Sequence, residues 1–204
     1  MKYFNVHTHR AARDNELTIR VCGLHPWHVN ENWQTMFNLF FGPLAYPYPG
    51  YEQPEILQAI GECGLDRQCT APYDLQLLAF KAQIAESERR RLPLIIHCVR
   101  AIDDMLHLKK DTTQPWVWHG FRGKPQQMQQ LLNHGFYISF GTRYNAESLA
   151  LCPNDRLFVE TDEEDINIKL LYEEIARCRN TSTEGLQRQV WNNANTLFDN
   201  IPSL

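Results

Sequence analysis

Residues 73–97 read YDLQLLAFKAQIAESERRRLPLIIH, a helical pattern followed almost directly by a short apolar run. Over residues 73–91, Leu and Ala recur at three- and four-residue spacing and basic residues close the segment, which predicts an amphipathic helix. Residues 94–97 have the composition of a buried strand that ends on His97. A helix that leads into such a strand is typical of an α/β fold with a parallel sheet.

Short apolar runs of this kind recur along the whole chain. Strands are expected over residues 3–7, 20–24, 59–62, 94–97, 116–119, 136–140 and 157–160. Further helices are expected over residues 124–134, 166–178 and 183–197, and a loop over the Pro- and Gly-rich residues 41–54. Strands that alternate with helices in this way predict a TIM-type (β/α) barrel.

The bulk composition sets limits on the class of protein. A chain of 204 residues can bury most of its apolar surface in one domain, so we expect a single domain over residues 1–204. The 43% hydrophobic and 22% charged residues are typical of a globular protein. A net charge of −4 argues against a protein that coats nucleic acid by bulk electrostatics. A nucleic-acid substrate would therefore require local positive charge.

The sequence also predicts the compartment. The first residues leave no room for the apolar core of a secretory signal, and no run approaches the roughly 18 apolar residues of a membrane-spanning helix. The six cysteines are scattered without a CxxC pair, which favours reduced thiols. We therefore expect a cytoplasmic protein without membrane contact, and a monomer.

Side chains that can ligate a metal follow the expected strands and are rare elsewhere. They are His7, His9, His25, Glu62, His97, His119 and Asp162. Because the carboxyl ends of parallel barrel strands share one face, these side chains are expected to converge there. His7 and His9 are two residues apart in an extended segment and so point the same way.

If His25 is left aside, this set offers four imidazoles and two carboxylates. Six protein ligands are more than the three or so that a single catalytic zinc keeps. This number points to two divalent ions about 3.5 to 4 Å apart that share a bridging carboxylate. Glu62 is the natural bridge, and Asp162 is expected to bind one ion and to accept the proton of the attacking water. Zinc, manganese and magnesium all suit these ligands.

Seven motifs, six of which carry these residues, resemble those of one family. They are NVHTH at 5–9, GLHPW at 23–27, AIGECGLD at 59–66, PLIIH at 93–97, HGF at 119–121, ETD at 160–162 and NANTLF at 193–198. In this order they resemble the TatD-type metal-dependent deoxyribonucleases of the amidohydrolase superfamily. The resemblance implies a hydrolase that cuts phosphodiesters, typically by removing nucleotides from a DNA 3′ end.

The resemblance also implies roles for individual residues. His7, His9 and Asp162 would hold one ion, His97 and His119 the other, and Glu62 would lie between the ions. His25 would contact a substrate phosphate, although a structural role beside Pro26 and Trp27 is equally compatible with its position. Arg100 and Arg122, together with Lys124 and Arg143, lie just beyond strand ends and are expected to bind phosphate, for which the arginine fork is suited. We therefore expect DNA or a nucleotide as substrate.

The chain departs from the family pattern in three ways that affect the site. Residues 98–100 read CVR where the family usually has SRD, and residues 120–122 read GFR where it usually has CFS, so Arg100 and Arg122 shift positive charge around the site. Only fifteen residues separate His9 from His25, where the family usually has a further helix, strand and helix. Because this crossover is short, we expect a trimmed barrel of about seven strands, or an irregular eighth position. The acidic residues 163–165 after Asp162 argue against close contact with a polyanion on that side.

Alternative interpretations remain open at this point. The same metal ligands serve amidohydrolases and esterases that act on small molecules, and a non-catalytic relative can retain a metal. Cys98 directly follows His97, but adjacent strand residues face opposite ways, so a buried apolar role is favoured over a nucleophile. Trp27, Trp116 and Trp118 can stack on a base, and for the last two a place in the core is favoured.

Overall fold

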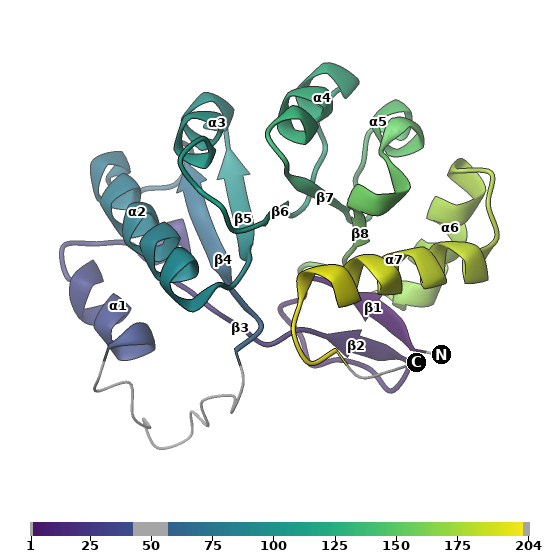
Figure 1. Cartoon of the computed structure of the whole chain (residues 1–204), viewed down its shortest axis with the longest axis horizontal. Helices are drawn as coiled ribbons and strands as arrows, with labels where there is room; N and C mark the ends of the chain where they lie inside the picture. The colour runs from purple at the N-terminus through teal and green to yellow at the C-terminus, as the bar shows by residue number, and fades with distance from the viewer. Residues whose placement is uncertain (1, 43–56, 202–204) are drawn as a thin grey trace. The chain divides into compact units, whose positions relative to one another are not determined.

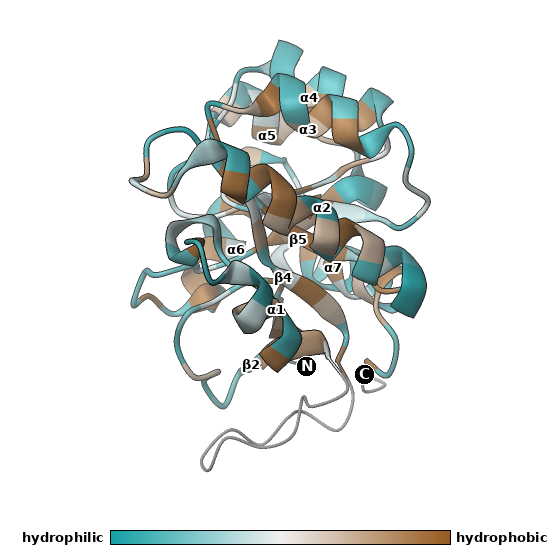
Figure 2. Cartoon of the chain, turned by 90° about the vertical axis from the view of Figure 1, so that its left-hand side faces the viewer, coloured by the Kyte–Doolittle hydropathy of each residue, from teal (hydrophilic) through white to brown (hydrophobic). Residues whose placement is uncertain are grey.

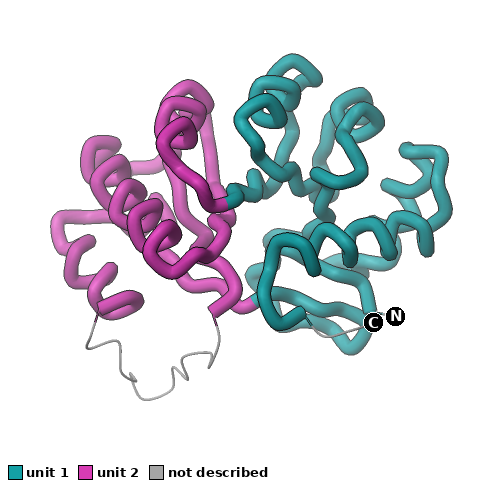
Figure 3. The backbone as a smooth tube through the Cα atoms, viewed as in Figure 1, with its two compact units in different colours: residues 1–19, 115–204 teal, residues 20–114 magenta. Residues whose placement is uncertain are grey.

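A computed structural model describes residues 2–42 and 57–201. The chain forms two compact units, which Figure 3 shows in different colours. Unit 1 is Met1–Ile19 with Pro115–Leu204, and unit 2 is Arg20–Gln114. Of the loop expected over residues 41–54, only Phe41 and Gly42 are described, and Phe41 is instead the last residue of helix α1 (Trp33–Phe41). The remainder of that loop lies outside the described residues. In the described part of the chain, none of the helices is both long enough and apolar enough to cross a bilayer.

Unit 2 is built around one long buried strand. β4 (Ala59–Asp66) pairs in parallel with β3 (Val21–Cys22) on one side and with β5 (Leu94–Val99) on the other. The helices of unit 2 are α1 (Trp33–Phe41), α2 (Tyr73–Arg90) and α3 (Ile102–Lys109), with a 3₁₀ turn η1 (Pro26–His28). Every residue of β4 is buried, because it has a strand on each side and α2 packs against it (Figure 1).

Helix α2 contributes two buried glutamines as well as its apolar residues, which alternate with hydrophilic ones in Figure 2. Gln83 accepts a hydrogen bond from Leu24 N at 2.7 Å and donates one to Leu24 O at 3.1 Å. Gln76 accepts from Asp66 N at 2.8 Å and donates to Asp66 O at 3.0 Å. Residues seven apart share one face of a helix, so a single face of α2 fixes the backbone at both of these strand ends.

Unit 1 combines the two ends of the chain. β1 (Tyr3–Asn5) pairs in parallel with β2 (Glu16–Thr18), while β6 (Trp116–Trp118), β7 (Tyr137–Phe140) and β8 (Leu157–Val159) form a parallel set. The backbone amide of Val6 donates to Val159 O at 3.1 Å, so the segment after β1 runs beside β8. The helices of unit 1 are α4 (Pro125–Asn133), α5 (Ala146–Leu151), α6 (Ile168–Cys178) and α7 (Thr183–Leu197), with a 3₁₀ turn η2 (Asn154–Arg156).

The last two helices cover β1 and satisfy its backbone. The Tyr172 hydroxyl on α6 donates to Phe4 O at 2.7 Å, and the Trp191 indole on α7 donates to Lys2 O at the same distance. The Phe4 ring packs against Phe158 and Phe198 in the core of unit 1. These contacts explain why the closing helices predicted from the sequence lie on the first strand.

All seven strands and all four helices expected from the sequence are present, and three helices, α1, α3 and α5, were not expected. The described residues contain eight strands rather than seven, because β2 occupies the eighth position that was expected to be irregular. It lies within the short crossover after His9 and pairs with β1 in parallel. Residues 6–15, all of which the structure describes, contain no helix. The connection is therefore as short as expected, yet it leads to a strand that is parallel to β1.

A buried ion pair stabilises this connection, which contains no crossover helix. The Arg10 guanidinium donates to both carboxylate oxygens of Glu16, at 2.7 and 3.0 Å, and to Ile166 O at 3.1 Å. The Glu16 side chain is fully buried. Burial raises the pKa of Glu16, but the hydrogen bond and the charge of Arg10 outweigh it, so this pKa lies below its ordinary value. The pair therefore ties the loop between β1 and β2 to the segment that follows β8.

We predict that Glu16→Gln lowers the free energy of unfolding by about 3 kcal/mol at pH 7, because it leaves the partly buried Arg10 without its counter-charge. Since the folded pKa of Glu16 is lowered, its contribution is complete above the ordinary carboxyl pKa and is lost as the pH falls through the folded value. Urea unfolding followed by circular dichroism at pH 7 and at pH 3 measures both effects.

The matched control is Asp165→Asn, which removes an exposed partner of Arg13 in a neighbouring ion pair. An exposed pair contributes little, so this variant should unfold close to the wild type. Equal stability of the two variants would show that the Arg10–Glu16 pair does not hold the connection.

Gly64 sets the spacing between β4 and β5. Its φ is +146°, and a Cβ built on it would lie 1.9 Å from the carbonyl oxygen of His97 on β5. Gly64 is paired with His97 in the strand register, just after an irregularity between Ile60 and Cys63 that contains Glu62. The close approach of the two strands thus requires glycine at this position.

We predict that Gly64→Ala destabilises the protein by about 3 kcal/mol or more, because strain at positive φ adds to overlap with the backbone. A thermal melt compares it with Gly141→Ala, where a Cβ would meet its nearest atom at 3.7 Å and φ is not positive. A Gly64→Ala melting temperature equal to that of the control would contradict the close approach.

Candidate metal centre

Unit 1 brings together three of the predicted ligands. His7 and His9 follow β1, and Asp162 follows β8; their nitrogen and oxygen ligand atoms all lie within 4.8 Å of one another. Asp162 Oδ1 lies 3.6 Å from His7 Nε2 and 3.4 Å from His9 Nε2. The Asp162 amide donates to His7 O at 3.1 Å, which fixes the two segments side by side. The predicted HxH pair therefore shares one carboxylate.

His119 lies in the same unit, with its ring centroid 4.6 Å from that of His7. Its Nδ1 is 3.3 Å from Oε1 of Glu160, a fully buried carboxylate at the end of β8. Burial raises the pKa of Glu160, but the charges of His119 and His7 and the hydrogen bond with His119 outweigh it, so this pKa is lowered. His119, Glu160 and Asp162 form a second group with ligand atoms within 4.8 Å of one another.

Unit 2 contains a cluster of its own around Glu62. Glu62 Oε1 lies 3.1 Å from His25 Nε2 and 2.7 Å from His97 Nδ1. Burial lowers the pKa of His25, and the neighbouring Glu62 offsets this only in part, so the pKa is below its ordinary value. A neutral imidazole is the form that ligates metals. His25 thus lies among metal-capable groups, while its predicted contact with phosphate stays a prediction.

Asp66 is a second carboxylate beside His97 to which the sequence analysis gave no role. Its Oδ2 lies 3.3 Å from His97 Nε2 and accepts a hydrogen bond from the Trp27 indole at 2.6 Å. Burial raises the pKa of Asp66, but hydrogen bonds from Trp27 and from the Gln68 amide outweigh it and lower the pKa. Asp66 is four residues after Glu62 in the same strand, and this even spacing was a usable signal that both face the same side.

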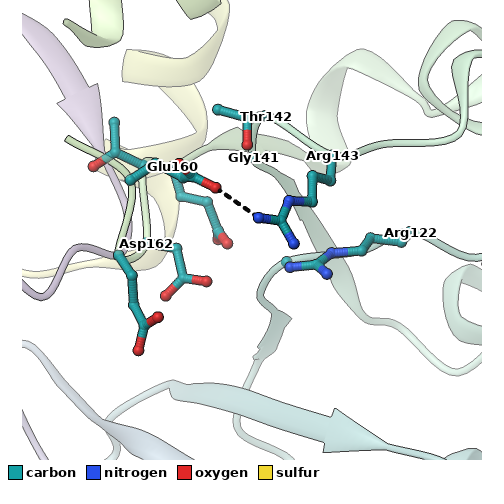
Figure 4. A pocket seen from close by; sticks show the side chains of 10 residues that line it. Arg122, Gly141, Thr142, Arg143, Glu160 and Asp162 are labelled. Atoms are coloured by element: carbon teal, nitrogen blue, oxygen red, sulfur yellow. Dashed lines mark hydrogen bonds and ion pairs between the residues drawn. The ribbon is translucent and has the colours of Figure 1, made fainter. Parts of the chain in front are cut away.

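Two of the predicted cationic residues line a pocket with Asp162 in unit 1. The pocket has a volume of about 90 Å³, and Figure 4 shows Arg122 and Arg143 pointing toward the side where Asp162 lies. The Arg143 guanidinium donates to Glu164 at 3.2 Å. Arg100 follows β5 in unit 2 with an exposed side chain. Its role in phosphate binding stays a prediction.

The acidic run after Asp162 is less repulsive than its sequence suggests. Glu164 pairs with Arg143 and Asp165 pairs with Arg13. Two of the three added negative charges thus have a guanidinium beside them. This arrangement weakens the objection that the run would keep a polyanion away from this side of unit 1.

The structure also bears on the cysteine and tryptophan residues. Burial raises the pKa of the Cys98 thiol to about 12, so the thiol is protonated at neutral pH and is a poor nucleophile. Trp116 and Trp118 are buried, which confirms their place in the core. Trp27, by contrast, has 54% of its surface exposed.

Comparison with known proteins places the chain among metal-dependent nucleases and hydrolases. Residues 2–199 match the family model described as TatD related DNase. An uncharacterized metal-dependent hydrolase of Buchnera aphidicola is 29% identical, over 94% of this chain and 77% of its own length. The 3′-5′ ssDNA/RNA exonuclease TatD of Escherichia coli is 32% identical, over 75% of this chain and 60% of its own length.

Solved structures agree with this result at the level of the fold. A TatD family hydrolase of Entamoeba histolytica superposes with a TM-score of 0.72 at 19% identity, covering 92% of this chain and 76% of its own. A TatD homolog of Escherichia coli gives 0.67 at 22% identity, covering 93% and 79%. These likenesses confirm the expected fold class, an α/β fold of the TIM-barrel type. With the family model matching nearly its whole length, the chain belongs to the TatD related DNase family.

Proposed function

We propose that this protein is a metal-dependent phosphodiesterase that removes nucleotides from the ends of single-stranded DNA or RNA. The observation that carries the proposal is the convergence of His7, His9 and Asp162, whose ligand atoms lie within 4.8 Å of one another. The exonuclease named TatD in Escherichia coli supports the substrate class. The proposal treats residues 1–204 as one hydrolase domain, because the family match runs through both units.

The residues present fit divalent metal ions. Two imidazoles and one carboxylate form the kind of three-ligand set that catalytic sites use while leaving a position open. In unit 1, His7, His9 and Asp162 would hold one ion, with His119 beside them; in unit 2, Glu62 and His97 would hold another. Imidazole and carboxylate suit zinc and manganese, and magnesium accepts the carboxylates.

The side chains divide the chemical work among them. A divalent cation lowers the pKa of a nearby water and stabilises negative charge on a phosphate. The Asp162 side chain is about one quarter exposed, so it can reach solvent and accept the proton of the attacking water. Glu62 is nearly buried and lies against the imidazoles of His25 and His97, so its carboxylate is held in place as a ligand. Asp66 and Glu160 orient His97 and His119 in the same way.

Positive charge for the substrate is local, as a net charge of −4 requires. Arg122 lines the pocket that contains Asp162, and its planar fork matches a phosphate. Arg143 lines the same pocket, but part of its charge is offset by Glu164. Arg122 therefore carries most of the proposed phosphate contact in unit 1, and His25 and Arg100 are proposed to serve neighbouring phosphates.

We predict that Asp162→Asn and Glu62→Gln each lower the rate of nucleotide release from single-stranded DNA by at least about 100-fold, because each removes a charged ligand. Chelation of metal should abolish the activity, and added manganese, magnesium or zinc should restore it. Elemental analysis provides a readout that does not depend on activity: both variants should hold less metal per chain. Asp155→Asn, an exposed acid in η2, is the control and should match the wild type.

Other outcomes of this assay would support the alternatives. Turnover of small esters or amides without release of nucleotides from any DNA or RNA would favour a metal-dependent hydrolase of small molecules. Bound metal in a protein that turns over none of these substrates would favour a non-catalytic relative. Either outcome would refute the proposed phosphodiesterase.

We further predict that Arg122→Ala raises KM for single-stranded DNA by about 10-fold, because a charge-assisted hydrogen bond to phosphate is lost. Arg143→Ala should have a smaller effect, since Glu164 already accepts from that guanidinium. Steady-state kinetics at fixed ionic strength distinguishes the two variants. Equal KM values for Arg122→Ala and the wild type would remove Arg122 from the substrate site.

A further inference from the structure

Trp27 in η1 is an exposed aromatic residue whose ring is nevertheless held in place. Its indole N–H donates to the buried Asp66 at 2.6 Å. The ring meets His25 edge-on, with centroids 4.9 Å apart and planes at 85°, and it meets His97 at 5.9 Å and 78°. Three contacts thus fix the orientation of a side chain that keeps 54% of its surface exposed.

The Trp27 side chain borders a cavity within unit 2. The cavity has a volume of about 490 Å³, which lies in the range of small-molecule binding sites. Its lining is Trp27, Asp66, Gln68, Cys69, Thr70 and Val99. A lining that combines an indole with the Gln68 amide and the Thr70 hydroxyl suits a flat, polar-edged ring such as a nucleobase.

The cavity adjoins the cluster around Glu62 through shared residues. Asp66 lines the cavity and also lies 3.3 Å from His97 Nε2. Trp27 is two residues after His25 and contacts it directly, and its backbone amide donates to His25 Nδ1 at 3.1 Å. A ligand in the cavity therefore lies next to His25, which is proposed to contact a phosphate, and next to His97, a proposed metal ligand.

We infer that this cavity binds the base of an unpaired nucleotide, which stacks on the indole face of Trp27. The inference rests on the proposed function and extends it by explaining a preference for single strands. In a duplex both faces of a base are covered by its neighbours, whereas a base at an unpaired end is available to stack on an aromatic side chain. Such stacking tolerates any base, because every base has a π-face.

A purely structural role for Trp27 accounts for less of what is seen. A side chain much smaller than tryptophan could donate a hydrogen bond to Asp66. A tryptophan with only a structural role would also be more favourable fully buried than with half of its surface in solvent. The two roles also predict different variants. Trp27→Phe keeps an aromatic face and loses the N–H donor, whereas Trp27→Ala loses both.

The test is the binding of a single-stranded oligonucleotide that carries 2-aminopurine at its 3′ end, in EDTA so that no cleavage occurs. Stacking on the wild-type indole should quench the fluorescence of the probe. Trp27→Ala should abolish this quenching and weaken binding about 10-fold, and Trp27→Phe should stay within about threefold of the wild type. Leu78→Ala, which truncates a similarly exposed apolar side chain on α2, is the matched control and should not differ from the wild type.

A second oligonucleotide with an abasic 3′ end separates stacking from misfolding. The wild type should bind it as weakly as Trp27→Ala binds the complete probe, and Trp27→Ala should not distinguish the two oligonucleotides. The inference is overturned if Trp27→Ala still prefers the complete probe, if the wild type binds both equally, or if Trp27→Phe loses all preference for the base. Binding without dependence on the base, from a protein that releases nucleotides in the metal-supplemented assay, would refute this inference alone. A wild type that neither binds in EDTA nor releases nucleotides when metal is added would refute the proposed function as well.

Discussion

A carboxylate is stable inside a protein only if positive charge or hydrogen-bond donors lie close to it. Each unit of this protein meets that condition by placing imidazoles beside a buried carboxylate. In unit 2, Glu62 lies against His25 and His97, and in unit 1 the fully buried Glu160 lies against His119. The imidazoles stabilise the negative charge, and the negative charge makes the same positions suitable for a cation. The same placing of imidazoles beside carboxylates therefore allows the carboxylates to be buried and gives these positions affinity for a metal ion.

The precision of this arrangement depends on groups that never touch a substrate. Gln76 and Gln83 on α2 hold the backbone of Asp66 and of Leu24, the residue before His25. The absence of a side chain at Gly64 allows β5 to bring His97 close to β4. Rigid secondary structure therefore sets the positions of the imidazoles in unit 2, as a site that must orient ligands requires.

Seven strands were predictable because each joins a short apolar run to a polar residue. This pattern can be recognised in the sequence without knowing which strand pairs with which. β2 was not predictable, because three residues with the sequence Glu-Leu-Thr carry no such pattern and their strand character comes from pairing with β1. The roles of Asp66 and Glu160 likewise depend on tertiary contacts, with His97 and His119 respectively. Asp162 shows a further limit: it lies beyond the end of β8 with a φ of +51°, so strand alternation does not determine where its side chain points.

The dependence of β1 on the end of the chain has a consequence for biosynthesis. Val6, Phe4 and Lys2 find their backbone partners in residues 159, 172 and 191, which are synthesised long after them. The contiguous residues 20–114 emerge long before these partners. The first strand therefore has an open edge until these residues have been made, a state that favours wrong pairings and engages chaperones. The synthesis of residues 159–191, rather than that of the first strand itself, is the event that lets unit 1 assemble.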